Sequence, residues 1–337
     1  MTRYPMLGVE YLYPKVLASR QLSYEDDLRA LLAQYTEDET TLQLYAATKL
    51  ARFLPEGGRV EEPSAVEMAA LRYYVAALEK FRERLPPRAG PLFEAYRVYV
   101  VARDVELIAR RMLQGRPLPG PGELAYPEAP EVQAARRRAE EEAPVVEVLR
   151  AAGLAEAARL LEKARDVEAL LSPAVDAEIV SRLEAARAAA STPEGRRILE
   201  NRVDIHAARA AAALAAARPG RELLSLYRGV LRGHRLQLDQ LMEAAETGDL
   251  EALEKLLVET LQGRVPEELP PLEAFTAQLR KENRRLAAGL PYREPLTYDT
   301  LVGLLETLLL DEEDAVIIAL AGYSRQRKSI VAELVSL

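Results

Sequence analysis

Side chains able to do chemistry are few in this chain and lie far apart. It contains two histidines, His206 and His234, and no cysteine, so a thiolate metal site or a cysteine nucleophile is excluded. Neither histidine has a second potential ligand at the spacing of a metal site. We expect His206 to be a polar helix position with a local partner. His234 lies in the sequence Arg-Gly-His-Arg, which indicates a turn between helices.

Carboxylates that interrupt apolar stretches are the second set of candidates. They are Asp104, Asp204 and, in an acidic cluster, Glu312 or Asp314. If the fold gathered them at one point, they could form a binding or acid–base cluster. Each also has a basic neighbour or lies near an exposed turn, so we favour a structural role in which paired charges fix the register of the helices.

No catalytic or nucleotide-binding motif accompanies these residues. The phosphate-binding loop, the dinucleotide-binding glycine pattern, the zinc-protease histidine pair and the nucleophile elbow are all absent from the sequence. The 17 glycines and 21 prolines fall mostly at expected helix ends, where they separate elements and do not cradle phosphates. We therefore predict no catalytic residue, no cofactor and no metal ligand, and a protein that is not an enzyme.

The composition bears on whether nucleic acid or a membrane is a partner of this protein. Hydrophobic residues make up 49% of the 337 residues, and the net charge of −8 disfavours nucleic acid as the main partner. The sequence has neither a signal-peptide pattern nor a continuous apolar run of the length needed to span a bilayer. We expect contact with a membrane only through partner proteins.

The elements that must position the acidic residues are long helices. Apolar residues recur at three- and four-residue spacing in residues 90–117, 196–220 and 301–322. Asp104 and Asp204 lie at similar places in the first two stretches, and the Glu312–Asp314 cluster lies in the third. We expect these stretches to stop at Gly115, at Pro219 with Gly220, and at Gly322, respectively. Their spacing of roughly one hundred residues predicts an all-α fold of three similar modules.

We expect one unit, residues 1–337, with pseudo-repeats at 1–120, 121–225 and 226–337 around a pseudo-three-fold axis. Further helices are expected at 24–35, 37–54, 64–85, 132–144, 145–151, 154–171, 173–190, 223–236, 236–248, 249–263, 275–289 and 323–337, with an interruption at Pro14 in a short first helix over 4–20. Proline-rich connections are expected at 118–131, 263–274 and 290–299. In residues 132–144, three arginines precede three glutamates by four positions, which indicates a solvated, salt-bridged face.

The same stretches resemble the central-stalk socket protein of the V/A-type rotary ATPases, known as their C-type subunit and equivalent to the d-type subunit of the eukaryotic V-ATPase. The family's first helix is matched by Arg103-Asp104-Val105-Glu106-Leu107-Ile108 and by Gly115-Arg116-Pro117. Its second copy is answered by Arg202-Val203-Asp204-Ile205-His206-Ala207, and its closing segment by the layout of Pro295, Glu312, Gly322 and residues 330–337. The similarity covers residues 10 to 335, with Leu107, Ala207 and Ala315 at positions where the family has asparagine.

The resemblance implies a funnel-shaped body with a central cavity. It implies a non-catalytic central-stalk subunit on the cytoplasmic side of the membrane, a socket that couples the rotor shaft to the proteolipid ring of a proton-translocating ATPase or ATP synthase. The shaft subunits and the ring would then be the partners. The residues alone leave open an alternative, a helical-repeat scaffold or adaptor that binds a partner protein and has no link to rotary motors.

Overall fold

A computed structural model describes residues 9–38, 40–55, 60–82, 85–262, 266 and 268–337. Over these residues every regular element is helical and no strand occurs, so the all-α prediction is confirmed. Within the same residues, no helix is both long enough and apolar enough to cross a membrane.

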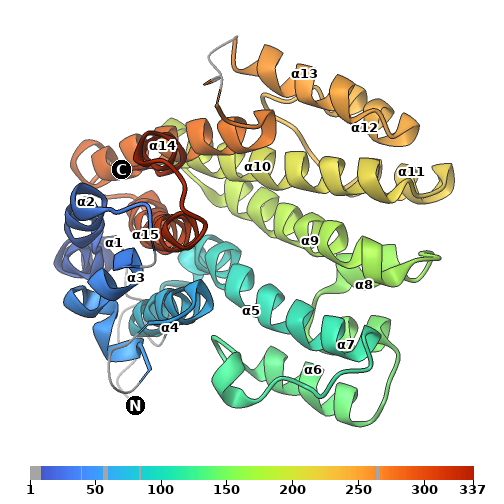
Figure 1. Cartoon of the computed structure of the whole chain (residues 1–337), viewed down its shortest axis with the longest axis horizontal. Coiled ribbons are helices and arrows are strands. Elements are labelled where there is room, and N and C mark those ends of the chain that lie inside the picture. The colour runs from blue at the N-terminus through green and yellow to red at the C-terminus, as the bar shows by residue number, and fades with distance from the viewer. Residues whose placement is uncertain (1–8, 39, 56–59, 83–84, 263–265, 267) are drawn as a thin grey trace.

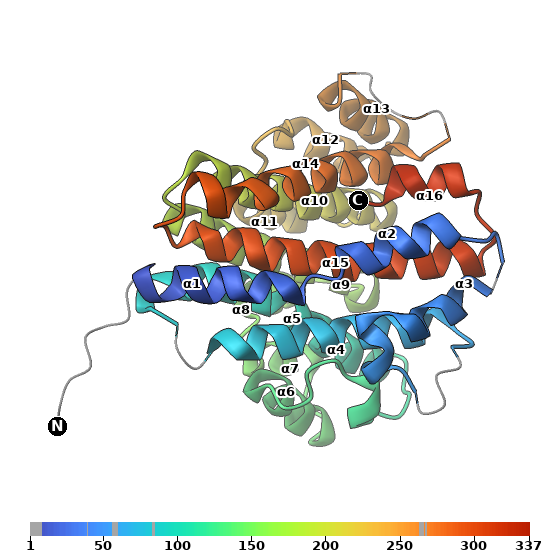
Figure 2. The same ribbon diagram turned by 90° about the vertical axis from the view of Figure 1, so that its left-hand side faces the viewer.

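Six long helices form the frame of the molecule, in three consecutive pairs: α4 (Pro63–Arg82) and α5 (Gly90–Leu113), α9 (Val167–Ala189) and α10 (Pro193–Ala217), α14 (Pro271–Arg293) and α15 (Asp299–Tyr323). Each pair also packs on the next, because α5 lies against α9, α10 against α14, and α15 against α4 (Figure 1). The three pairs therefore form a closed circuit. Figure 2 shows α14, α15 and α4 crossing the view in successive rows, with α1 (Val9–Ser19) between the last two.

Shorter helices cover this frame. Along the first part of the chain these are α2 (Glu25–Gln34) and α3 (Thr40–Gln43), which lie with α1 against α15. The middle of the chain adds α6 (Pro130–Glu140), α7 (Val145–Ala151) and α8 (Ala155–Leu161) beside α5 and α9. The last part adds α11 (Arg221–Val230), α12 (Leu238–Thr247), α13 (Leu250–Thr260) and α16 (Lys328–Leu334). Short 3₁₀ helices lie at Arg20–Leu22, Leu44–Ala47, Lys49–Phe53, Pro87–Ala89 and Pro121–Glu123.

Two apolar clusters hold these layers together. The larger is continuous from α1 to the first half of α15 and includes buried residues of all six frame helices. The smaller joins the N-terminal segment to the second half of α15, with Tyr24, Tyr45 and Tyr73 among its members. The phenol of Tyr45 donates a hydrogen bond to the carbonyl of Ala315 at 2.6 Å, which ties the start of the chain to its end.

Several helix ends follow the local signals in the sequence. Gly115 has a φ of 61°, and the amides of Gly115 and Arg116 donate to the carbonyls of Met112 and Arg111, respectively. This is the glycine-terminated helix end that the sequence predicts. Thr192 caps α10 by accepting a hydrogen bond from the amide of Gly195, and Pro193 occupies the first turn.

Other predicted boundaries were wrong. Residues 37–54 form α3 and two 3₁₀ helices in place of one long helix. Pro14, Pro173 and Pro291 lie inside continuous helices: α1 is not interrupted, α9 extends from Val167 through the expected break, and α14 continues into the expected connection at 290–299. At Pro173 and Pro291 burial explains the continuous helix: both prolines are buried, so their packing offsets the backbone hydrogen bond that proline cannot make.

Gly322 is also not the end of its helix. The last stretch continues to Tyr323, and Arg325 takes the left-handed conformation with a φ of 58°. Gly322 instead allows close packing, because a Cβ atom at this position would lie 2.8 Å from Cβ of Thr41.

Candidate functional site: a charged pit and an apolar groove

The aspartates that the sequence singles out do not converge on one point. Asp104 of α5 accepts hydrogen bonds from the amides of Ala125 and Tyr126 at 3.0 and 2.7 Å. Asp204 of α10 accepts from the amides of His234 and Arg235 at 2.7 and 2.9 Å. Each carboxylate thus fastens a loop that follows its own helix, and the proposed carboxylate cluster does not form.

Asp314 of α15 makes the corresponding contact. It accepts from the amide of Ser336 at 2.9 Å and from the Ser336 hydroxyl at 2.7 Å, 22 residues further along the chain. Burial raises the pKa of Asp104 to about 6 and raises the pKa of Asp204, while the amides that donate to each carboxylate lower it. The three side chains therefore share one structural role, which differs from the predicted pairing with neighbouring arginines at Asp104 and Asp204.

His206 has a polar partner and His234 lies in a turn, but the carboxylates that contact them both lie on α9. The Nδ1 atom of His206 lies 2.7 Å from a carboxylate oxygen of Asp176, and that histidine is buried. His234 lies between α11 and α12 with its Nε2 atom 2.5 Å from Glu184. The part of the chain that the structure describes contains no group of three or more His, Asp or Glu side chains placed to hold a metal ion.

A buried ion network joins the second and third helix pairs. Arg202 of α10 donates to Glu306 at 2.9 Å and to Glu313 at 2.6 Å. Two arginines of α14 bond the same acidic stretch of α15: Arg280 contacts Glu313 and Asp314, and Arg284 contacts Asp311 and Asp314. Burial works to raise the pKa of Glu313, but Arg202 and Arg280 hold it at about 2. Because removal of one partner would leave a buried charge uncompensated, this network fixes how the helices meet.

Glu312 is the exception in this stretch. It is 2% exposed, and its Oε2 atom has no hydrogen-bond partner among the described residues. Burial, together with the charge of Glu313, raises its pKa to about 8, although Arg103 and Arg280 act to lower it. The side chain is therefore protonated near neutral pH, which explains how an unpaired carboxyl is tolerated there.

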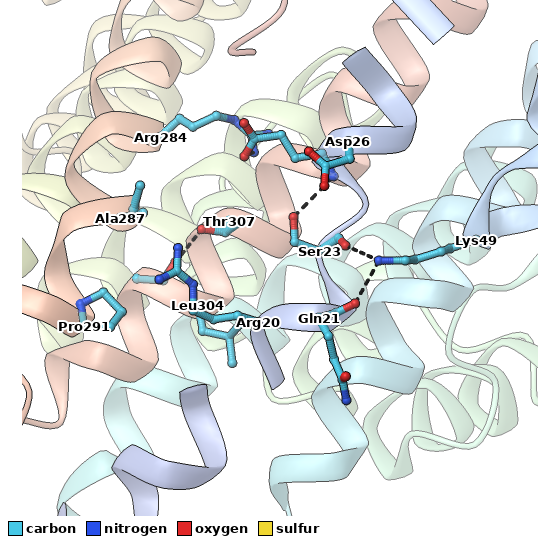
Figure 3. Close-up of a pocket in the computed structure, with 13 residues that line it drawn as sticks. Arg20, Gln21, Ser23, Asp26, Lys49, Arg284, Ala287, Pro291, Leu304 and Thr307 are labelled. Atoms are coloured by element: carbon cyan, nitrogen blue, oxygen red, sulfur yellow. Dashed lines mark hydrogen bonds and ion pairs between the residues drawn. The ribbon is translucent and has the colours of Figure 1, made fainter. Parts of the chain in front are cut away.

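A cleft between the N-terminal segment and the α14–α15 pair is shown in Figure 3. Its volume is about 330 Å³, but its cations already have partners. Lys49 donates to the carbonyls of Gln21 and Ser23, and Arg284 pairs with Glu25. Arg20 stacks on the ring of Tyr292 at 5.0 Å. These contacts fasten the first helices to the third pair, although the buried Nη1 atom of Arg20 has no hydrogen-bond partner among the described residues.

A second cavity, which we call the charged pit, opens between α4, α5, α9 and α10. It encloses about 310 Å³ and is lined by Glu67, Tyr99, Arg103, Glu106, Ser172, Val175, Asp176, Ile179, His206 and Arg209. Most of its polar groups pair with one another: Arg103 with Glu67, Ser172 with Glu106, and His206 with Asp176. Arg209 differs, because its side chain is exposed and makes no hydrogen bond or ion pair within the described chain, although the nearby charge of Asp176 raises its pKa.

A third cavity, the apolar groove, adjoins the pit through Arg209, which lines both. The groove encloses about 610 Å³ between α14, α15 and α16, and its apolar lining includes Leu269, Leu272, Ile317, Leu320, Ile330 and Leu334. Leu320 is 51% exposed. An apolar hollow of this size with an exposed leucine can accommodate a protein segment.

The turns within the helix pairs meet at one end of the molecule. Asp299, at the start of α15, accepts hydrogen bonds from the amides of Ser191 and Thr192 in the α9–α10 turn, at 3.1 and 2.7 Å. Helix α1 reaches both other pairs at this end, because Tyr13 donates to the carbonyl of Pro291 and Lys15 to that of Lys80. In Figure 2, α4 ends and α14 turns into α15 on the left-hand side of the view. Tyr292 and Leu296 project there with exposures of 71% and 66%.

Comparison with protein-family models and with curated proteins finds no match to this sequence. The site must therefore be interpreted from its own geometry. Arg209 and the apolar groove could not be selected from the sequence, since a lone arginine in an alanine-rich helix and scattered leucines give no local signal. The one available hint was the position of Arg209 in the second aspartate-bearing stretch.

Proposed function

We propose that this chain is a non-catalytic central-stalk subunit of a V/A-type rotary ATPase or ATP synthase, similar to the C-type subunit of that family and to its eukaryotic d-type equivalent. In this role it is a socket on the cytoplasmic side of the membrane. It couples the central rotor shaft to the proteolipid ring, while ATP chemistry and proton movement take place elsewhere in the complex.

The observation that carries the proposal is the closed circuit of three helix pairs with one repeated contact. In each pair the second helix bears an aspartate, Asp104, Asp204 or Asp314, that accepts a backbone N–H from a later loop. Three copies of one structural unit explain why the contact recurs at the same place. Under this interpretation the units extend past residues 120 and 225, because the partners of Asp104 and Asp204 lie beyond those positions. The pseudo-three-fold funnel that the family resemblance implies remains part of this proposal.

The two ends of the molecule suit the two expected partners. The charged pit and the apolar groove together would be the central cavity that receives the end of the shaft. The face of the helix-pair turns, with the exposed Tyr292 and Leu296, would meet the ring. The absence of a membrane-spanning helix from the described residues agrees with contact to the membrane through the ring alone.

Affinity capture from native membranes tests this proposal. The tagged chain is expressed in its source cells, membranes are solubilised in a mild detergent, and the captured proteins are identified by mass spectrometry. We expect proteolipid and shaft proteins together with the catalytic ones. Recovery of soluble partners alone would contradict the motor assignment and favour the helical scaffold, an alternative that the apolar groove also suits.

A pair of variants makes the test specific to the proposed ring face. Tyr292→Asp with Leu296→Asp changes two exposed side chains, so the chain should fold while losing proteolipid and retaining the shaft. Leu250→Asp is the matched control, because Leu250 is 47% exposed on α13 and lies away from the turns. Equal loss of proteolipid in both variants would show that the turn face is not the ring contact.

A further inference from the structure

The apolar groove has opposite charges at its two ends. Arg209 marks one end, near Arg280 of α14 and Glu313 of α15, which are ion-paired at 2.8 Å. Glu273 lies two turns before Arg280 on α14, about 10 Å away along the helix. It is exposed, lines the groove and makes no ion pair within the described residues. Glu268, which lines the groove near Glu273, is already paired with Arg327 at 2.8 Å.

The charged groove side chains without a hydrogen bond or ion pair in the described chain are therefore Arg209 and Glu273, set apart along its length. A bound α-helix carries the complementary pattern, because its unpaired carbonyls make the C-terminal end negative and its unpaired amides make the N-terminal end positive. The apolar lining between the two charges would cover one face of such a helix. A strand would present its backbone to apolar side chains without satisfying its hydrogen bonds.

We propose that the apolar groove binds a single amphipathic helix of a partner protein in one polarity. The C-terminal turn of that helix lies at Arg209, its N-terminal turn lies at Glu273, and its apolar face packs on Leu272, Ile317 and Leu320. The identity of the partner as the rotor shaft rests on the proposed function, but the polarity of the helix does not.

Substitutions at the two ends test the charge pattern. The binding partner captured with the chain is purified, and its affinity for each variant is measured by titration calorimetry. Arg209→Glu should weaken binding about 10-fold and Arg209→Lys less than about 3-fold, because the charge and not the guanidinium shape interacts with the helix end. Leu320→Asp should weaken it more than about 10-fold, through loss of apolar contact.

The matched control is Arg285→Glu, which makes the same charge change at an exposed position of α14 outside both cavities. Circular dichroism of each Arg209 variant checks that the fold is kept, because Asp176 and Glu313 interact with the charge at this position. An equal loss of affinity in Arg209→Glu and Arg285→Glu would overturn the local contact, as would an unchanged affinity for Arg209→Glu.

Cross-linking tests the polarity directly, and the natural absence of cysteine allows single labels. Ile317→Cys lies toward Arg209, and Ser324→Cys lies two turns further along α15. Each is labelled with a maleimide photo-cross-linker, and the complex is irradiated and mapped by mass spectrometry, with Leu250→Cys as the control. Partner residues attached to Ile317→Cys should lie about seven positions C-terminal to those attached to Ser324→Cys.

The outcomes separate this inference from the proposed function. Adducts in the expected order on a shaft protein support both. The expected order on a helix of an unrelated protein supports the groove and contradicts the motor assignment. The reverse order, adducts on a second copy of this chain only, or no adducts above the control would overturn the inference.

Discussion

At the scale of single residues, the burial of Glu312 makes the folding stability of the protein depend on pH. Its carboxyl group faces Glu313 from the same helix, and Glu67 and Arg103 from the first pair. Its pKa is about 8 in the folded protein, above the ordinary value of 4.5. The folded state therefore binds a proton that the unfolded state releases between these two values. Stability attributed to this residue is present below pH 4.5 and is lost as the pH rises through 8.

We predict that Glu312→Gln removes this pH dependence. Between pH 5 and pH 8 the unsubstituted protein should lose about 1.4 kcal/mol of unfolding free energy per pH unit relative to the variant, up to about 4 kcal/mol in total. Urea unfolding of both proteins at unit steps from pH 5 to pH 9 measures the difference. Other titrating groups are common to the two proteins and cancel. Parallel stability curves would show that Glu312 is ionised throughout.

The residue types in the sequence predicted some contacts of the polar side chains and did not predict others. A polar partner for His206 and a turn at His234 followed from the sequence, but the identity of the partner did not, because Asp176 lies 30 positions away on α9. The amide contacts of Asp104 and Asp204 did not, because their donors lie 21 to 31 residues further along the chain and carry no side-chain signal. Adjacent arginines suggested ion pairs, but Arg103 bonds Glu67 and Arg202 bonds Glu306 instead.

At the scale of elements, two glycines in helices have opposite roles. A methyl group at Gly322 of α15 would meet Thr41, whereas a Cβ atom at Gly229 of α11 would have no heavy atom within 4 Å. We predict that Gly322→Ala destabilises the protein by about 1–3 kcal/mol through overpacking. Gly229→Ala should stabilise it by up to about 1 kcal/mol, because alanine restricts the unfolded chain.

Denaturant midpoints of the two variants, compared with the unsubstituted protein, measure the difference. The sign is the informative quantity, since both substitutions add the same group to a helix. A stabilising Gly322→Ala would mean that the contact between α15 and α3 relaxes without cost, and would remove the packing role assigned to this glycine.

Element boundaries could be predicted where local chemistry decides them. Gly115 ended its helix as expected, and the side chain of Thr192 caps the start of α10. Pro173 and Pro291 did not end theirs, because tertiary burial outweighs the lost backbone hydrogen bond. Residues 37–54 have helical composition, yet they form short turns that place Leu42, Tyr45 and Leu50 in the smaller apolar cluster.

At the scale of the whole molecule, the three helix pairs depend on one another. Helix α9 buries one face on α5, and α10 buries one on α14, so the middle pair has no complete core of its own. We predict that residues 121–225, the expected second repeat, do not fold when expressed alone. Urea titration by circular dichroism should show no cooperative transition, while the full chain shows one. A fragment with a sharp transition and dispersed amide resonances would contradict this dependence.

The all-α class and the count of long apolar stretches were accessible from periodicity alone. The order in which the pairs pack was not, because contacts between α15 and α4 join residues more than two hundred positions apart, and no single sequence records them.

The hydrogen bonds between the N-terminal segment and α15 have a consequence for biosynthesis. Tyr24, Tyr35 and Tyr45 find their partners on α15 and the segment after it, which the ribosome makes 270 to 291 residues later. A nascent chain must therefore expose these tyrosines until α15 has been made, at a time when aggregation is most damaging. Because such distant pairing slows folding, the newly made protein should depend on chaperones that hold this segment until α15 emerges.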